Sequence, residues 1–230
     1  MSNHLKRHFA PKTWGIKRKG IKFITNSRPG THKKNISLPL NIILRDILDY
    51  ADCNREARFI LGTRDVTVDG LRRRDYRFPL GLFDVLSLND INEHFRVILD
   101  KKGKIDLIKI SNKEKSLKLC KIIGKKMFKG NLQLNLYDGK NIFVKEDNYK
   151  IGDSVLLTPG KKNEIKEKIS LDKNALVYLT RGVYIGQIGK VQDIIGNRIL
   201  YKIGSQVVET LKEDVIPIGK DKPLITITER

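Results

Sequence analysis

Apolar residues between positions 37 and 51 recur at intervals of three and four, which is the spacing of one face of a helix. That face consists of Leu40, Ile43, Leu44, Ile47 and Leu48. Ser37 can cap the helix through its hydroxyl, and Pro39 suits the first turn, where a backbone N–H has no partner. The pattern therefore predicts a helix that begins near Ser37.

The residues that follow predict a second helix and a β-hairpin. Asp52 or Asn54 can cap the helix, and Gly62 can end it. Val66-Thr67-Val68 alternates as a half-buried strand does, and Asp69-Gly70 is a strong hairpin turn signal. The whole stretch thus indicates a compact helix–helix–hairpin unit.

Short strands separated by turn signals dominate the rest of the chain. Before residue 172, strands are expected at residues 95–99, 105–110, 132–136, 142–144 and 154–157. After it, they are expected at 176–179, 199–203 and 224–227, and glycines at 182, 186 and 189 let a loop bend tightly. Several short strands at such spacing predict a small β-barrel in the middle of the chain and a similar third unit after it.

The charge balance narrows the class of partner. The chain has 230 residues, with 46 Lys and Arg against 26 Asp and Glu, so its formal net charge is +20. Such a chain calls for a polyanion, which is nucleic acid, an anionic membrane surface or an acidic protein. A membrane-surface protein would concentrate charge on one amphipathic helix, whereas here the charge runs along the whole sequence. Nucleic acid is therefore the favoured partner, and no membrane partner is expected.

Two segments carry the largest local excess of positive charge. Residues 1–36 hold ten Lys and Arg and no acidic residue, and they lack a hydrophobic period. We expect this arm to be largely disordered alone and to order on RNA, with Trp14 in contact with a base or a neighbouring domain rather than buried. Residues 101–130 hold eleven Lys against Asp106 and Glu114, an excess that solubility alone does not explain.

The start of the chain and the cysteine content bear on its location. The first seven residues lack the apolar core of a secretory signal, and no stretch reaches the ~18 consecutive apolar residues of a membrane helix. Cys53 and Cys120 are too few for a disulfide framework or a zinc cluster. These features are typical of a soluble cytosolic protein.

No constellation of catalytic or cofactor-binding residues stands out. The sequence lacks the glycine spacing of a dinucleotide fold, and its Gly-Lys pairs at 124, 160, 189 and 219 lack the rest of a P-loop. It has no nucleophile elbow, no C-x-x-C and no H-E-x-x-H. His4 and His8 have helical spacing but no third metal ligand. We therefore expect no enzyme activity, no cofactor, no metal and no small-molecule substrate.

Several runs of residues resemble those of a known family. The runs at 37–46, 54–58, 66–70 and 84–86 are similar to the small RNA-binding domain shared by ribosomal proteins and some RNA-modifying enzymes. The runs at 4–7, 10–14, 28–33, 209–211 and 214–220 match the small-subunit ribosomal protein family called S-four-e. The chain length suits the archaeal form of that family.

The third unit carries a further resemblance. Tyr178 to Val191 is similar to the glycine-centred KOW motif, which sits on a small SH3-like barrel. Cys53 stands where the family usually has a capping Thr, so Asp52 is expected to take over that cap, and Val183-Tyr184-Ile185 replaces a more polar loop.

The resemblance implies an α+β, multidomain fold. Its expected parts are a basic N-terminal extension at 1–36, a helix–helix–hairpin RNA-binding domain at 37–94, a central β-barrel at 95–171, and an SH3-like barrel with the KOW motif at 172–230.

The function implied is that of a structural, non-catalytic constituent of the small ribosomal subunit in the cytoplasm, which positions rRNA through phosphate contacts. Its expected partners are small-subunit rRNA and neighbouring ribosomal proteins. Two alternatives stay open: an RNA-modifying enzyme that docks through the same domain, and a KOW-type transcription or translation factor.

The residues expected to contact RNA are mostly cations. They are Lys6, Arg7, Lys12, Trp14, Lys17, Arg18, Lys19, Lys22, Arg28, Lys33, Lys34, Arg45, Arg55, Arg58, Arg64, Arg72, Arg73, Arg74, Lys125, Lys126, Arg181 and Lys190. The arginines of the second helix and of the hairpin are expected to form a bipartite clamp on phosphates, because a guanidinium group binds phosphate bidentately.

Overall fold

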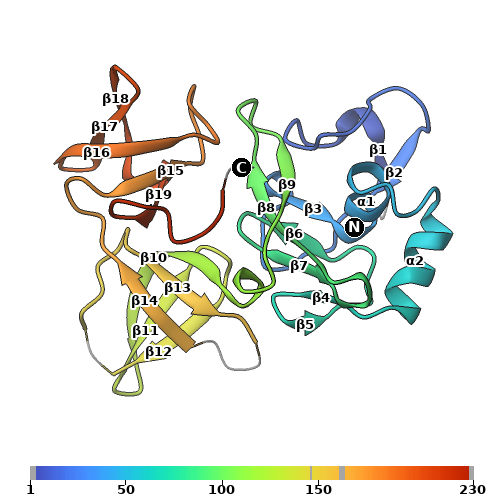
Figure 1. Ribbon diagram of the computed structural model, residues 1–230, viewed down its shortest axis with the longest axis horizontal. Helices are drawn as coiled ribbons and strands as arrows, with labels where there is room; N and C mark the ends of the chain where they lie inside the picture. Colours follow the sequence, from blue (N-terminus) through green and yellow to red (C-terminus); the bar gives the residue numbers. More distant parts are fainter. Residues whose placement is uncertain (1–3, 146, 161–163, 228–230) are drawn as a thin grey trace. The chain divides into compact units, whose positions relative to one another are not determined.

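The protein is built mostly from β-strands, with few helical turns (Figure 1). The computed structural model describes residues 4–145, 147–160 and 164–227. The chain forms two compact units: unit 1 contains Met1–Ile98 and Lys104–Lys115, and unit 2 contains Leu99–Gly103 and Ser116–Arg230. Within the described residues, no helix is long and apolar enough to span a membrane.

The amino-terminal segment of unit 1 is folded, so the expected disorder is wrong for residues 4–36. β1 (His4–Lys6) pairs antiparallel with β2 (Phe23–Thr25), and the buried side chains of Leu5 and Ile24 lie opposite each other. A 3-10 turn, η1 (Arg7–Phe9), follows β1. The backbone of Trp14 bridges Ile105. A core therefore forms from a few dispersed apolar residues, which a search for a regular hydrophobic period overlooks.

The first predicted helix is short and begins later than expected. Ser37 lies in β3 (Ser37–Pro39), which pairs with β6 (Pro79–Gly81), and its hydroxyl donates to the Lys33 carbonyl at 3.0 Å. The predicted cap at Ser37 is therefore wrong. Helix α1 (Leu40–Ile42) continues directly into the π-helical turn η3 (Ile43–Ile47). The predicted apolar face is nonetheless buried at Leu40, Ile43 and Leu44.

The second predicted helix is confirmed as α2 (Asn54–Thr63), but both of its ends differ from the prediction. Cys53 occupies the N-cap position without a side-chain hydrogen bond. Asp52 does not act as the cap; its backbone N–H donates to the Glu56 carboxylate at 2.8 Å. Gly62 lies inside the last turn rather than ending the helix.

A five-stranded sheet in the order β5-β4-β7-β8-β9 completes unit 1. Its strands are β4 (Val66–Val68), β5 (Leu71–Arg72), β7 (Val85–Leu88), β8 (Glu93–Leu99) and β9 (Ile105–Lys109). The hairpin at Asp69-Gly70 is confirmed, since both residues have positive φ, 51° and 71°, as the tight turn requires.

Strands β8 and β9 correct the predicted boundary at residue 95. The sequence placed them in the central barrel, yet β8 pairs with β7, and Phe95 lies opposite Leu86. Both side chains are buried in the core of unit 1. The short 3-10 turn η4 (Asn89–Ile91) separates β7 from β8 in the sequence. The spacing of strands along the chain could not show that β8 crosses this turn to pair with β7.

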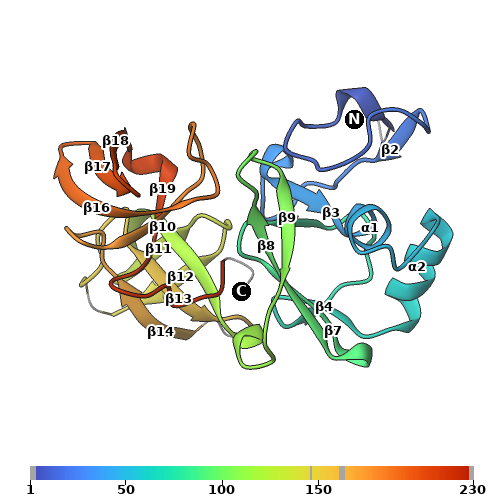
Figure 2. The ribbon, with the colours of Figure 1, turned by 45° about the horizontal axis from the view of Figure 1, so that its top comes forward.

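Unit 2 begins with a five-stranded sheet in the order β12-β11-β10-β13-β14, which curls in both views of the ribbon (Figures 1 and 2). Its strands are β10 (Lys118–Phe128), β11 (Asn131–Leu136), β12 (Asn141–Val144), β13 (Ser154–Thr158) and β14 (Glu164–Ile169). Their inner faces enclose a buried cluster that includes Ile122, Leu134 and Val155. The strands predicted at 132–136, 142–144 and 154–157 are confirmed.

A second sheet of unit 2 has the order β18-β17-β16-β15-β19. Its strands are β15 (Leu176–Leu179), β16 (Ile188–Ile195), β17 (Arg198–Ile203), β18 (Gln206–Leu211) and β19 (Val215–Gly219). The strand predicted at 224–227 is wrong: only an isolated bridge between Gly219 and Pro223 forms there. Ile225 and Ile227 are buried without belonging to a strand, which explains their apolar pattern.

Candidate nucleic-acid interface

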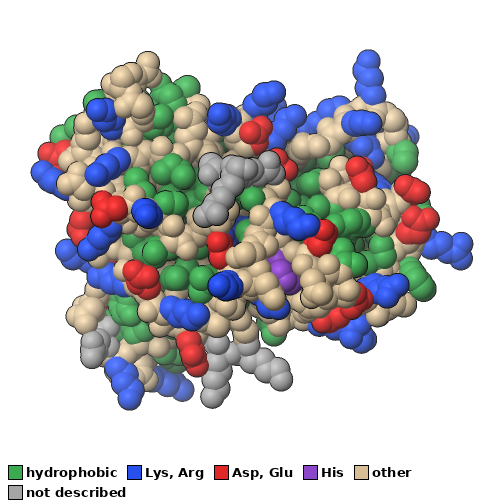
Figure 3. Space-filling view, in the orientation of Figure 1, with side chains coloured by type: hydrophobic (Ala, Val, Ile, Leu, Met, Phe, Trp, Pro, Cys, Tyr) green, Lys and Arg blue, Asp and Glu red, His purple; other side chains and the backbone are tan. Residues whose placement is uncertain are grey.

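On the face that Figure 3 shows, Lys and Arg side chains are scattered, with acidic side chains between them. The residues expected to contact RNA differ in how they are held. Some are buried, some are paired with carboxylates or carbonyls, some lie over aromatic rings, and the others are free to meet a phosphate.

Two of the expected contact residues are buried and serve the fold instead. The Trp14 side chain is 1% exposed, and its indole N–H donates to the Lys34 carbonyl at 3.4 Å. Arg7 is also buried, and its guanidinium donates to the carbonyls of Ile21 and Lys17 at 3.1 and 2.9 Å. The expectation that Trp14 is available for contact rather than buried is therefore wrong, and Arg7 holds the amino-terminal loop.

A second group is engaged by neighbouring protein groups at or near the surface. Arg18 donates to the carbonyls of Ala10 and Pro11 at 2.7 and 2.8 Å. The other members pair with carboxylates: Arg28 with Asp75, Arg45 with Asp46, Arg64 with Asp90, Arg72 with Asp65, Lys125 with Asp147, and Arg181 with Asp214. The pairs of Arg28, Arg64, Arg72 and Arg181 have exposed cations and contribute little to stability, so a phosphate can compete for them. The Arg45 side chain is only 13% exposed and is less accessible to a phosphate.

Four of the expected contact residues lie over aromatic rings. Arg58 of α2 lies 4.1 Å from the centroid of the Tyr76 ring, and Arg73 lies 4.5 Å from that of Phe78. Lys6 and Lys22 lie 6.0 and 5.6 Å from the rings of Phe9 and Phe23. A guanidinium stacked on a ring keeps its edge N–H groups free for another partner.

The remaining expected residues are exposed and form no ion pair within the described part of the chain. They are Lys12, Lys17, Lys19, Lys33, Lys34, Arg55, Arg74, Lys126 and Lys190. Partial burial lowers the pKa of Lys34 from its ordinary value.

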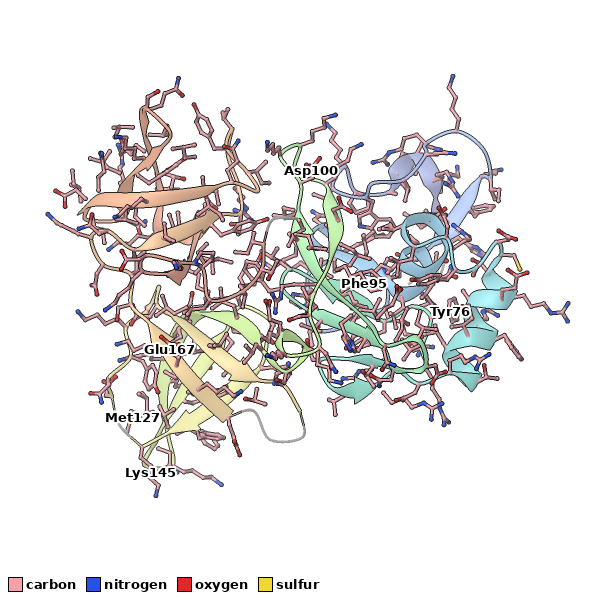
Figure 4. All side chains as sticks on the ribbon, in the orientation of Figure 1. Tyr76, Phe95, Asp100, Met127, Lys145 and Glu167 are labelled. Atoms are coloured by element: carbon pink, nitrogen blue, oxygen red, sulfur yellow. The ribbon has the colours of Figure 1, made fainter. Side chains whose placement is uncertain are left out.

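Helix α2 and the segment after the hairpin come together at Arg58 and Tyr76. The C-terminal end of α2 also meets the hairpin, because Arg72 donates to the Arg64 carbonyl at 3.2 Å. We call the exposed side of α2 together with residues 72–78 the helix–loop surface; Figure 4 labels Tyr76 within it. The two halves of the expected clamp are thus adjacent.

Tyr76 was missed as a member of this surface. The signal for it is visible in the sequence, since Arg72-Arg73-Arg74-Asp75-Tyr76-Arg77-Phe78 interleaves cations with aromatic residues. That interleaving is typical of nucleic-acid contacts, in which rings and guanidinium planes stack on bases.

The lysine excess of residues 101–130 has a partly structural origin. Lys118 is buried and forms a 2.9 Å ion pair with buried Asp138. Lys121 donates to the carbonyls of Lys212 and Glu213 at 2.6 and 3.0 Å, and burial lowers its pKa to about 8. These two cations hold unit 2 together and are unavailable to RNA.

The loop between β15 and β16 owes its shape to glycine. Gly182 and Gly186 have φ values of +93° and +76°, which favour a residue without a side chain. A Cβ on Gly186 would lie 2.5 Å from the Leu99 carbonyl oxygen. The predicted tight bend is therefore confirmed, and Arg181 lies within it.

The described residues contain no cluster of three or more His, Cys, Asp or Glu side chains that could hold a metal ion. A cavity of about 440 Å³ in unit 2 is lined in part by Lys121, Tyr137, Ile151 and Arg181. Two of its three lining cations are already engaged, since Lys121 donates to carbonyls and Arg181 pairs with Asp214. The cavity therefore offers exposed cations to a ligand less readily than the helix–loop surface does.

Comparisons with known proteins connect these features to one family. The family model described as "Ribosomal family S4e" matches residues 91–163, and that of the RS4NT domain matches residues 1–35. Proteins named small ribosomal subunit protein eS4 are similar over 97% of this chain and 97% of their own length: the one from Methanococcus aeolicus is 41% identical, and the one from Methanocaldococcus jannaschii is 40% identical. The crystal structure of the 30S ribosomal protein S4e from Thermoplasma acidophilum superposes with a TM-score of 0.71 at 30% identity, covering 82% of this chain and 97% of that one.

Proposed function

Because this chain belongs to the ribosomal S4e family, we propose that its helix–loop surface is where it holds small-subunit rRNA. The chain is a structural constituent of the small ribosomal subunit, and rRNA and ribosomal proteins are its partners. The observation that carries the proposed location is the stack of Arg58 on Tyr76, which joins α2 to residues 72–78 in one basic and aromatic surface.

The chemistry proposed for this surface is positioning without catalysis. The ring of Tyr76 orients the guanidinium plane of Arg58, and Arg55 lies on the same exposed helix without an ion pair in the described residues. Oriented guanidinium groups bind phosphate oxygens bidentately, and such contacts fix the register of an RNA without reading its sequence. No cofactor is needed for this role.

The exposed lysines of residues 4–36 extend the proposed interface. They stand on a folded segment, so they meet the RNA as preorganised charges rather than as a disordered arm. Lys12, Lys17 and Lys19 form no ion pair in the described residues, and their ammonium groups suit phosphate as point charges. Preorganisation lowers the conformational entropy lost on binding.

We also propose the four-part layout with one changed boundary. It consists of the extension at 1–36, the RNA-binding domain from residue 37 through β9, a central barrel from about residue 116 to 171, and the SH3-like barrel with the KOW motif at 172–230. The sheet orders support this division, since each five-stranded sheet is separate. Neither the RNA-modifying enzyme nor the free KOW-type factor has an observation in its favour.

The experiment uses the full chain and deproteinised small-subunit rRNA from the source organism. Arg55→Ala combined with Arg58→Ala should weaken binding by roughly 1–3 kcal/mol for each arginine–phosphate hydrogen bond that is removed. The thermal unfolding midpoint should stay nearly unchanged, because both side chains are exposed. Arg198→Ala is the matched control, since it removes an exposed arginine of unit 2 that pairs with Glu209.

Unaltered affinity in the double variant would show that this face points to solvent and that the proposed location is wrong. Unfolding of the variant would assign these arginines a structural role instead. An equal decrease in affinity for the Arg198→Ala control would show that only total charge matters.

A further inference from the structure

Strand β11 presents a row of amide side chains to solvent. Leu132, Leu134 and Leu136 alternate into the core, so Gln133 and Asn135 project from the opposite face of the sheet. The Gln133 side-chain N–H donates to the Asn135 side-chain oxygen at 3.0 Å. That bond orients both amides and leaves the Gln133 oxygen as an acceptor and the Asn135 amino group as a donor.

The neighbouring strands add aromatic rings on the same face. Phe143 of β12 lies opposite Gln133, and Phe128 of β10 lies opposite Asn131. The two ring centroids are 6.1 Å apart, and the side chains are 46% and 55% exposed for Phe128 and Phe143. Exposure of such large apolar rings to water is unfavourable, and a partner with a flat apolar surface would cover them.

Positive charge surrounds these rings. Lys126 lies opposite Gln133 and forms no ion pair in the described residues, and the Lys129 ammonium lies 5.5 Å from the centroid of Phe128. Figure 4 shows Lys145 and Met127 at the same end of this sheet. No carboxylate occupies an outward position of β10 beyond Gly124, or of β11 or β12, all of which lie in the described part of the chain.

We propose that this face, called the amide–aromatic face, binds unpaired nucleotides of the rRNA. It consists of Lys126, Phe128, Gln133, Asn135, Asn141 and Phe143. One base stacks on a phenylalanine ring, its edge meets the oriented amides, and the lysines neutralise the flanking phosphates. The proposal rests on the rRNA-binding function, but it uses unit 2 and none of the residues of the helix–loop surface.

Unpaired RNA fits this face better than the other polyanions do. A duplex keeps its bases stacked on each other and offers mainly phosphates and hydroxyl groups. It therefore presents no free base on which the exposed phenylalanine rings could stack. The side chains that give an acidic protein its charge are carboxylates, which would neutralise the lysines but only accept hydrogen bonds and offer no flat ring to stack on the phenylalanines. A single-stranded segment satisfies rings, amides and cations together.

The test compares full-length variants on three RNA probes: deproteinised small-subunit rRNA, an oligouridylate and a duplex of equal length. Phe128→Ala with Phe143→Ala should weaken binding to rRNA and oligouridylate at least about 5-fold, because the ring on which a base stacks is removed. Binding to the duplex should stay unchanged. The dependence of affinity on salt should also keep its slope, because stacking releases no counterions.

Controls separate stacking from nonspecific loss of apolar surface. Phe128→Tyr with Phe143→Tyr should bind as the parent does, since tyrosine stacks equally well. Ile195→Ala, which truncates an exposed side chain of the other sheet, should have no effect. Rings this exposed should leave the unfolding midpoint unchanged, and 5-iodouridine in the rRNA should crosslink to Phe128 or Phe143.

Full rRNA affinity in the double alanine variant would overturn this proposal and leave the helix–loop surface intact; a protein partner would then be the occupant of the face. Equal decreases in affinity for oligouridylate and duplex would also overturn it. Absence of any rRNA binding by the parent chain would overturn the proposed function as well, so the two failures are distinguishable.

Discussion

Asp138 is predicted to be the most sensitive carboxylate of unit 2. Its side chain is 2% exposed, and its carboxylate accepts hydrogen bonds from the buried Lys118 ammonium at 2.9 Å and from the Lys140 backbone N–H at 3.2 Å. At an effective dielectric constant of about 20, the attraction at this distance is about 6 kcal/mol, which desolvation of both ions largely offsets. Removing Asp138 alone takes away the carboxylate that offsets the charge of the buried Lys118 ammonium.

Asp138→Ala should therefore destabilise unit 2 by about 3–5 kcal/mol. Replacing both partners by apolar residues, Lys118→Met with Asp138→Leu, should restore most of that stability, because no buried charge remains. Asp147→Ala is the matched control: this carboxylate pairs with Lys125 at the same sheet but is 64% exposed, so its removal should cost under about 1 kcal/mol.

Urea unfolding followed by far-UV circular dichroism measures these changes. The chain has one tryptophan, Trp14 in unit 1, so its fluorescence provides a separate reading of the unit that the substitution does not touch. A destabilisation under about 1 kcal/mol for Asp138→Ala, or a double variant no more stable than the single one, would refute the reasoning.

The pKa of Asp138 adds a pH dependence to the same pair. Burial alone would raise that pKa, but the ammonium groups of Lys118 and Lys140 outweigh burial and hold it below its ordinary value. The folded chain then binds this proton less tightly than the unfolded chain does. Its contribution to stability is present above the ordinary pKa of about 4 and is lost as the pH falls further.

Three further predictions follow from buried or strained positions. Trp14→Ala should destabilise unit 1 by about 3–5 kcal/mol in circular dichroism melts, because the ring is buried. A variant that kept its stability and lost only RNA affinity would contradict this and would indicate that Trp14 stacks on a base. Gly186→Ala should lower the unfolding midpoint more than Gly182→Ala does, since both have positive φ but only Gly186 meets backbone oxygens; equal midpoints would contradict this. The pKa of Lys121, lowered to about 8 by burial, means that the folded chain binds this proton less tightly than the unfolded chain. The free energy of unfolding should therefore rise from about pH 8 to about pH 10, and Lys121→Met should abolish that rise in urea titrations.

Local patterns predicted those elements whose apolar residues follow one simple period. Strand β11 buries every second residue, and helix α2 buries Ala57 and Leu61, four residues apart. The turn at Asp69-Gly70 was likewise predicted, because its residue types favour the positive φ that it has. Strand β10 was missed, because Lys118 and Lys121 interrupt its apolar pattern. Both lysines are buried, and each depends on partners far along the chain, which periodicity does not register.

The amino-terminal segment is a second place where the local sequence pattern does not register distant contacts. Its composition is that of a disordered arm, yet Trp14 and Arg7 organise it through carbonyls up to 20 residues away. Charge alone could not separate Arg7, which is buried, from its exposed neighbour Lys6. Net charge predicted the class of partner, whereas the assignment of each cation needed the tertiary contacts.

The salt dependence of rRNA affinity tests most directly whether the positive charge of this chain serves phosphate binding. If about 10 phosphates are neutralised, a plot of log Kobs against log salt concentration should have a slope on the order of −7 to −9. The Arg55→Ala and Arg58→Ala double variant should have a shallower slope, since fewer counterions are released. A slope near about −2 for the parent chain would mean that few of these cations meet phosphate, and it would contradict the proposed role of the charge.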